Sequence, residues 1–256
     1  MGNLNDRFRL DGSTAVVTGA SFGLGYGIAE GLAESGANIV AVSRRAENLK
    51  DVQAVVASYG RECLPVVCDV SDQDQVDAMV AQALERFGRI DILVNNAGII
   101  KRSPAVDFTE ADWKSVIDVN LNGVWYCCQA AGRAMVSQKR GKIINIGSVL
   151  SFQGGILVPS YAAAKGALGQ LTQALANEWA SEGVNVNGIA PGYCVTANTE
   201  ALRADAGRSE AILARIPAGR WGTPDDLKGA AVFLASEASD YIHGHMLVVD
   251  GGWLGR

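Results

Sequence analysis

Short apolar runs alternate with longer amphipathic stretches along the whole chain. The apolar runs are rich in Val and Ile with few polar interruptions, which is typical of strands buried on both faces of a parallel sheet. They cover residues 13–18, 38–43, 64–70, 90–96, 142–148, 184–191 and 246–252. The stretches between them are long enough for crossover helices and cover residues 24–35, 45–58, 72–87, 109–136, 160–181 and 224–236. The pattern predicts an α/β fold, a doubly wound sheet of seven parallel strands with helices on both faces.

The rhythm is interrupted once, at residues 193–222, which follow the sixth predicted strand. This segment carries polar helical patterns that contain Arg. Because ligands of open α/β sheets bind at the carboxyl ends of the strands, an insertion at this place would cover the site. We expect residues 1–256 to form a single domain in which 193–222 is a small substrate lid.

The first predicted strand runs directly into a glycine-rich segment, and a helix follows at once. Glycines at such a junction let the backbone turn tightly and approach a pyrophosphate, and the helix N-terminus offers unpaired N–H groups and a positive dipole end. At the first strand-to-helix junction of a parallel sheet, this favours a Rossmann-type dinucleotide site over a simple turn. The residues expected to bind the dinucleotide here are Gly19, Ser21, Phe22, Gly23, Leu24 and Gly25.

The end of the second predicted strand bears on which dinucleotide is bound. A site for NAD usually has Asp or Glu at this place, which binds the 2′-hydroxyl of the ribose. The chain has Ser43, Arg44 and Arg45 instead, so a carboxylate is missing and two guanidinium groups are present. Guanidinium groups suit the 2′-phosphate of NADP, although the two arginines are also compatible with a solvated helix start. The sequence predicts that NADP(H) is favoured over NAD(H).

Tyr161 and Lys165 are four residues apart in a helical stretch, so their side chains lie one turn apart on the same face. A phenol with a pKa near 10 is a poor base at neutral pH, but a nearby ammonium group favours the phenolate. Lowering the pKa of the phenol by about 3 units requires about 4 kcal/mol, which a partly buried charge can supply. Ser148 ends the fifth predicted strand, where its hydroxyl can bind a substrate oxygen.

Composition and charge narrow the possible partners. The chain has a net charge of −5, and its basic residues occur in runs no longer than two, so we expect no nucleic acid partner. No apolar run reaches the roughly 18 residues that cross a bilayer, so we expect a cytoplasmic protein with no membrane partner. The five cysteines form no CxxC pair, which suits a reducing compartment, and we expect them to be buried as small apolar residues.

Two further groups of residues are interpreted as structural. His243 and His245 have no other His or carboxylate cluster near them in the sequence, so they are interpreted as polar loop residues and no metal site is expected. The five tryptophans are expected to serve in packing or in subunit contacts.

The motifs occur in an order that resembles the short-chain dehydrogenase/reductase family over essentially the whole chain. The residues that carry the resemblance are TGASFGLG (18–25), Asp69-Val70, NNAG (95–98), Asn120, Ser148, Tyr161 with Lys165, Pro191-Gly192 and VDGGW (249–253). The resemblance implies an NAD(P)-dependent oxidoreductase that interconverts a secondary alcohol and a ketone by hydride transfer. It also implies a homotetramer assembled through apolar helices such as 109–136 and 160–181.

The resemblance also implies individual roles. Tyr161 would act as general acid/base, Lys165 would lower its pKa and bind the nicotinamide ribose, and Ser148 would orient the substrate. Asn120 would hold a water in a proton relay, whereas a buried Asn inside a helix is by itself typical of a structural amide. The other implied contacts are Asp69 and Val70 with the adenine, Asn96, Ala97 and Gly98 with the adenosine side, and Pro191, Gly192 and Thr196 with the nicotinamide.

Longer stretches are similar to the sugar-acid dehydrogenases of this family, the group of 2-dehydro-3-deoxy-D-gluconate 5-dehydrogenase and gluconate 5-dehydrogenase. They are residues 95–104, 150–165, 177–180, 189–205, 216–227 and 249–256. Ser43-Arg44 departs from the NAD-type strand end common in that group. A sugar acid brings a carboxylate, which Arg can bind bidentately. Arg102 is the first candidate for this role and Gln153 and Arg203 are further ones, beside substrate contacts from Ser148 and Tyr161.

Other functions remain open at this point. A 3-oxoacyl carrier-protein reductase would share the same catalytic residues but needs a basic surface for its acidic carrier. A polyol or steroid dehydrogenase is compatible, because the lid sequence does not define the shape of a pocket. A non-catalytic dinucleotide-binding regulator would have lost some of the catalytic residues, and here all of them are present.

Overall fold

The computed structural model describes residues 3–256. Seven strands form one sheet in the order β3-β2-β1-β4-β5-β6-β7, and every neighbouring pair is parallel. The strands are β1 (Thr14–Thr18), β2 (Asn38–Ser43), β3 (Cys63–Val67), β4 (Ile92–Asn95), β5 (Gly141–Ile146), β6 (Val184–Pro191) and β7 (Met246–Val249). The predicted fold class is confirmed.

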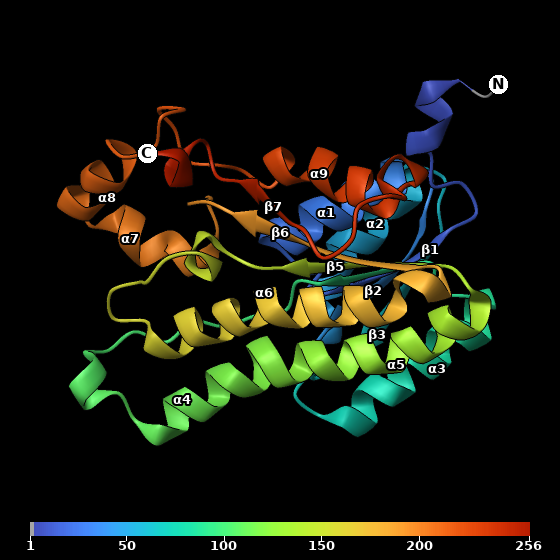
Figure 1. The fold of residues 1–256 in the computed structure, drawn as a ribbon, viewed down its shortest axis with the longest axis horizontal. Coiled ribbons are helices and arrows are strands. Elements are labelled where there is room, and N and C mark those ends of the chain that lie inside the picture. The colour runs from blue at the N-terminus through green and yellow to red at the C-terminus, as the bar shows by residue number, and fades with distance from the viewer. Residues whose placement is uncertain (1–2) are drawn as a thin grey trace.

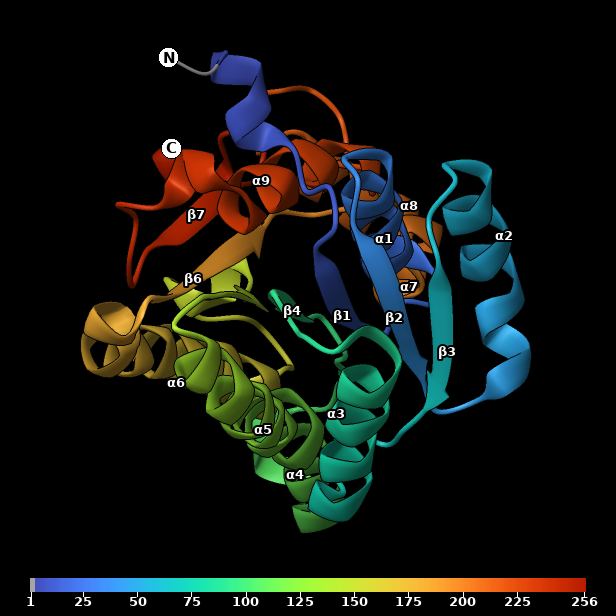
Figure 2. The same ribbon diagram turned by 90° about the vertical axis from the view of Figure 1, so that its right-hand side faces the viewer.

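Helices cover both faces of the sheet (Figure 1). One face carries α1 (Gly23–Glu34), α2 (Lys50–Ser58) and α9 (Asp225–Ala235), and the other carries α3 (Gln73–Phe87), α4 (Glu110–Ile117), α5 (Gly123–Gln138) and α6 (Pro159–Trp179). Figure 2 shows the twisted sheet between these two layers. The core is divided accordingly. On β2, Ile39 packs with the first layer and Val40 with the second, so alternate side chains are buried on opposite faces.

The single helix expected over 109–136 is divided in the structure. After α4 the chain forms one turn of π-helix at Asp118–Asn122 and then continues as α5. The wider turn presents the fully buried Asn120 to the backbone of Ile99. The Asn120 amide donates to the Ile99 carbonyl and accepts from the Ile99 N–H, both at 2.8 Å. These long-range hydrogen bonds explain why helical periodicity alone missed the interruption.

Residues 193–222 lie at the carboxyl end of the sheet, beside the C-terminus and away from the N-terminal helical turn (Figure 1). They contain a 3-10 turn (Ala197–Thr199), α7 (Glu200–Ala204) and α8 (Ala206–Leu213). Ile212 and Ile216 pack against Val149 and Trp253 in a small apolar cluster separate from the main core. Within residues 3–256, no helix has both the length and the apolar character needed to cross a membrane.

The cysteines and tryptophans occupy several environments. All five cysteines are free, and four are buried while Cys63 is half-buried. Trp253 is buried, and the ring of Trp179 packs so closely on Gly132 that a Cβ there would lie 2.7 Å from it. Trp113 and Trp125 are exposed on α4 and α5.

Candidate functional site

The candidate site is a cleft at the carboxyl edge of the sheet. The strand order changes direction between β1 and β4, and the crevice at such a point is the usual ligand site of open α/β sheets. Three adjoining hollows form the cleft, one beside Arg44 and Arg45, one along the glycine loop, and one of about 130 Å³ beside Tyr161. The cleft therefore joins the residues predicted to bind a dinucleotide to those predicted to be catalytic.

The glycine loop is packed too tightly for any side chain at two positions. Gly19 has a φ of +67°, which favours glycine, and a Cβ on Gly25 would lie 2.2 Å from the Gly19 carbonyl oxygen. No side chain caps the N-terminus of α1, where Phe22 is the N-cap residue. The first N–H groups of α1 therefore have no capping side chain. Because this end of the helix lines the cleft, these groups are suited to bind an anionic ligand.

Asn96 lies beneath this loop. Its side-chain amide donates to the carbonyl oxygens of Thr18 and Gly19, both at 3.0 Å. The Thr18 hydroxyl accepts from the N–H groups of Asn96 and Ala97 at 3.0 and 3.1 Å. The structure thus places the Asn96 amide as a support of the glycine loop, while the chain from Asn96 to Gly98 lines the cleft. Sequence reasoning missed Thr18, whose signal was a hydroxyl at the last position of β1.

At the far end of the cleft, Ser43, Arg44 and Arg45 face Asp69 and Val70. The Asp69 carboxylate accepts from the Ser71 hydroxyl at 2.7 Å and from the Ser71 N–H at 3.0 Å, so it is engaged in a local turn. Within residues 3–256 neither Arg44 nor Arg45 forms an ion pair, and both are exposed. Asn48 also lines this end and was not among the predicted residues.

Tyr161 and Lys165 lie on the same side of α6, as their spacing predicts. The Lys165 amine is 5.6 Å from the centre of the Tyr161 ring and donates a 2.5 Å hydrogen bond to the Ile146 carbonyl. Lys165 is only 4% exposed, and burial lowers the pKa of its amine to about 8. Its charge is therefore sensitive to pH near neutrality.

Burial raises the pKa of Tyr161, and this effect outweighs two opposing ones, the interaction with the Ser148 hydroxyl and the positive charge of Arg102. The Lys165 amine, expected to lower this pKa, is hydrogen-bonded to the Ile146 carbonyl. Ser148 lies just beyond β5, and its hydroxyl also accepts from the Leu150 N–H at 3.1 Å. Burial thus favours the neutral phenol of Tyr161 over the phenolate.

The hollow beside Tyr161 contains some of the predicted substrate residues but not all. Arg102 and Ser148 line it, and Arg102 donates a 2.8 Å hydrogen bond to the Asn198 carbonyl of the 3-10 turn. Gln153 does not line it and instead accepts from Arg215 at 3.4 Å. Arg203 does not line it either and donates to the Thr196 carbonyl at 3.3 Å.

Arg208 was missed by sequence reasoning but lines this hollow from α8. Its presence depends on how the segment 193–222 folds over the sheet, which the sequence does not reveal. Among residues 3–256, no Asp or Glu lines the hollow. Pro191, Gly192 and Thr196 line the neighbouring part of the cleft, as expected.

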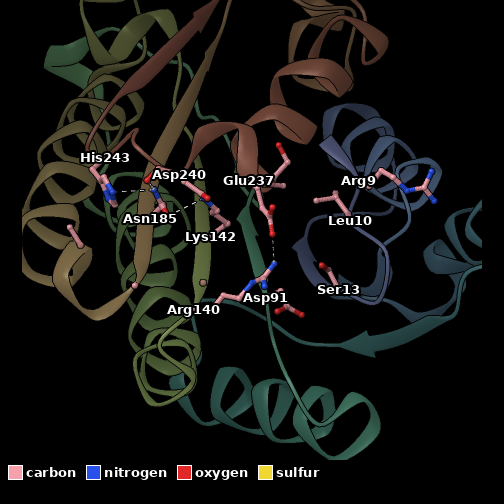
Figure 3. Close-up of a pocket in the computed structure, with 15 residues that line it drawn as sticks. Arg9, Leu10, Ser13, Asp91, Arg140, Lys142, Asn185, Glu237, Asp240 and His243 are labelled. Carbon is pink, nitrogen blue, oxygen red and sulfur yellow. Dashed lines mark hydrogen bonds and ion pairs between the residues drawn. The ribbon is translucent and has the colours of Figure 1, made fainter. Parts of the chain in front are cut away.

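A second polar pocket lies at the opposite, amino edge of the sheet (Figure 3). Several of its polar side chains pair with one another: Lys142 donates to Asp240 at 2.7 Å and to Asn185 at 3.0 Å, and Arg140 faces Glu237 at 3.6 Å. His243 contacts Asn185 in this pocket, and residues 3–256 contain no cluster of three or more potential metal ligands. The carboxyl-edge cleft is therefore the better candidate for a functional site.

Comparison with known proteins finds similarity over nearly the whole chain. A family model described as "Enoyl-(Acyl carrier protein) reductase" matches residues 19–254. The chain is 54% identical to a 2-dehydro-3-deoxy-D-gluconate 5-dehydrogenase from Pseudoalteromonas atlantica, over 98% of this chain and 99% of that protein. It is 53% identical to the protein of the same name from Bacillus subtilis, over the full length of both.

Among solved structures, the chain resembles a gluconate 5-dehydrogenase from Burkholderia cenocepacia in complex with NADP and tartrate. The two are 44% identical with a TM-score of 0.96, and the match covers 99% of this chain and all of the other.

Proposed function

Since this chain belongs to the short-chain dehydrogenase/reductase family, we propose that it is an NAD(P)-dependent oxidoreductase that interconverts a secondary alcohol and a ketone on a sugar acid. One observation carries the choice of substrate class: in a chain with a net charge of −5, the cleft is lined by five cations and a single carboxylate. The cations are Arg44, Arg45, Arg102, Lys165 and Arg208, and the carboxylate is Asp69. Such a cleft suits two anions, a dinucleotide and an acidic substrate.

The residues of the cleft fit a nicotinamide dinucleotide. The glycine loop and the uncapped N-terminus of α1 would hold the pyrophosphate, Asp69 and Val70 the adenine, and the chain from Pro191 to Thr196 the nicotinamide. When bound, this cofactor supplies the acceptor or donor of hydride. Arg44 and Arg45 have no acidic partner and support a preference for NADP(H), as does the NADP in the Burkholderia cenocepacia structure.

The side chains beside the reacting carbon have complementary tasks. In ketone reduction the Tyr161 phenol donates a proton to the substrate oxygen, and in alcohol oxidation the phenolate takes it back. The Ser148 hydroxyl binds the same oxygen. The positive charge of Arg102 favours the phenolate. Protonated Lys165 is proposed to act in the same sense, so that the phenol gives up its proton more readily. Asn120 is proposed to hold a water in a proton relay, because its two hydrogen bonds with Ile99 leave one N–H donor and one acceptor position of the amide free for it.

Arg102 is proposed to bind the carboxylate of the sugar acid, and residues 193–222 are proposed to act as the lid over it. The hollow that Arg102 lines contains no carboxylate that would compete for its guanidinium. The names of these two relatives support the same substrate class.

A panel of purified-enzyme assays tests this function. NADPH and NADH oxidation would be followed with a keto sugar acid, with the neutral keto sugar and with an acetoacetyl thioester. We expect the acid to have the highest kcat/KM. A preference for the thioester would instead indicate a carrier-protein reductase, and a preference for the neutral sugar would indicate a polyol dehydrogenase.

The protein is also proposed to be a cytoplasmic homotetramer. Five free cysteines support a reducing compartment, and the exposed rings of Trp113 and Trp125 support a subunit contact through α4 and α5. Light scattering coupled to size exclusion would give the mass of the assembly. A monomer in that measurement would reject the tetramer without affecting the proposed activity.

A further inference from the structure

We infer that Arg208 of α8 is a second anion-recognising residue, which binds the carboxylate of the substrate from the lid side while Arg102 binds it from the β4 side. This inference rests on the proposed function and deepens it, since it makes selection for acids depend on the placement of the lid. Arg208 is a specificity residue in this scheme and takes no part in proton transfer.

The position of Arg208 follows from the fold of the lid. Asp205 is the N-cap residue of α8, and its carboxylate accepts from the Arg208 N–H at 2.9 Å. This cap begins α8 beside the hollow, so that Arg208, in the first turn, lines the hollow together with Leu202 of α7 and Asn198 of the 3-10 turn. Arg208 is therefore a residue of the substrate side of the lid.

The other arginines of residues 193–222 are engaged elsewhere. Arg203 donates to the Thr196 carbonyl, and Arg215 stacks 4.0 Å from the centre of the Trp253 ring. Arg220 forms two hydrogen bonds with the Asp226 carboxylate, at 2.6 and 2.7 Å. Within the described part of the chain, the Arg208 side chain alone among these four has neither a hydrogen bond nor an ion pair. An uncommitted guanidinium in a hollow with no carboxylate is suited to an incoming anion.

Arg102 is only partly available for the same anion. One of its terminal nitrogens donates to the Asn198 carbonyl, which fastens the loop after β4 to the base of the lid. A carboxylate has two oxygens and can accept from two guanidinium groups at once. A substrate carboxylate shared by Arg102 and Arg208 would thus join the lid to the body of the protein.

Steady-state kinetics with paired substrates test the inference. KM and kcat would be measured with a keto sugar acid and with its neutral counterpart, in which CH₂OH replaces the carboxylate. Arg208→Ala should raise KM for the acid about tenfold to a hundredfold, because a hydrogen bond to a charged group is lost. KM for the neutral sugar and kcat for the acid should change less than about twofold, and Arg208→Lys should lie between Arg208→Ala and the wild type.

A matched control uses the same helix. Glu210 is exposed on α8 and does not line the hollow, so Glu210→Ala should leave both KM values unchanged. The inference is overturned if Arg208→Ala leaves KM for the acid unchanged, or if it raises KM equally for both sugars, which would indicate a role in lid packing. If the wild type already shows no preference for the acid, the proposed substrate class fails and the inference fails with it. If the preference exists but persists in Arg208→Ala, only the inference fails.

Discussion

The amine of Lys165 donates a 2.5 Å hydrogen bond to the carbonyl oxygen of Ile146 and so fastens α6 to the end of β5. Because the amine is buried, its pKa lies at about 8, compared with 10.5 for an ordinary lysine. Burial therefore fixes the geometry of the candidate catalytic helix and also makes the charged form of the Lys165 amine, which prevails below pH 8, unfavourable in free energy. This relationship has a consequence for stability that can be measured without substrate.

The first prediction concerns the pH dependence of folding. Between pH 8 and 10.5 the unfolded chain holds a proton at Lys165 that the folded chain has lost. The contribution of Lys165 to the free energy of unfolding therefore rises with pH in this window. It is lost again as the pH falls through about 8. Relative to Lys165→Met, the free energy of unfolding of the wild type should rise by about 3 kcal/mol across the window. Urea unfolding of both proteins from pH 8 to pH 10.5 measures this difference. Parallel curves for the two proteins would contradict it.

The second prediction concerns proton transfer. The hollow is lined by two phenols, Tyr161 and Tyr193. Tyr161→Phe removes the one proposed to transfer the proton, and we expect kcat to fall by about 100-fold to 10,000-fold. The dissociation constant of the dinucleotide, measured by fluorescence titration, should change little. Tyr126→Phe removes a hydroxyl from α5 outside the cleft and should have no effect on kcat. Near-full turnover by Tyr161→Phe would remove Tyr161 from the proposed chemistry.

Much of the fold could be predicted because the apolar runs are bounded by polar residues. The bounds of β2 and β6 agree with the sequence pattern. The polar residues Asn38 and Ser43 are the half-buried ends of β2, and β6 is buried over its whole length, Val184–Pro191. The run 64–70 was predicted too long. Beyond Val67 the chain is no longer paired as a strand and forms the turn at Asp69, although Cys68 and Val70 remain buried.

The site could be predicted in part. Residues within one element, such as Tyr161 and Lys165, have a relationship that is fixed by helical spacing. The π turn at Asn120 and the support of the glycine loop by Asn96 depend on hydrogen bonds between distant segments, which leave no local pattern. Arg208 depends on the path of the lid in the same way.

The third prediction concerns cofactor choice. In Ser43→Asp, a carboxylate at the end of β2 would repel a 2′-phosphate and accept from a 2′-hydroxyl. We expect the wild type to prefer NADPH, and the ratio of kcat/KM for NADPH over NADH to fall at least about tenfold in the variant, which corresponds to about 1.4 kcal/mol. Ser58→Asp, at the exposed end of α2, adds the same charge outside the cleft and serves as the control. An unchanged ratio in Ser43→Asp, or a wild type that prefers NADH, would reject the assignment of NADP(H).

The fourth prediction compares two glycines that lie in helices. In Gly25→Ala the new Cβ would lie 2.2 Å from the Gly19 carbonyl oxygen and 2.4 Å from the Asn96 amide, so the glycine loop must move. We expect a loss of about 1–3 kcal/mol in the free energy of unfolding, together with weaker dinucleotide binding, since the loop can no longer present its backbone to the pyrophosphate. Gly229 is exposed on α9 with no atom within 4 Å of its Cβ position, so Gly229→Ala should raise stability by about 0.5–1 kcal/mol and leave binding unchanged. Urea unfolding and fluorescence titration with NADPH distinguish the two effects. Equal affinity for NADPH in Gly25→Ala and in the wild type would show that the dinucleotide does not depend on the close packing of Gly19, Gly25 and Asn96.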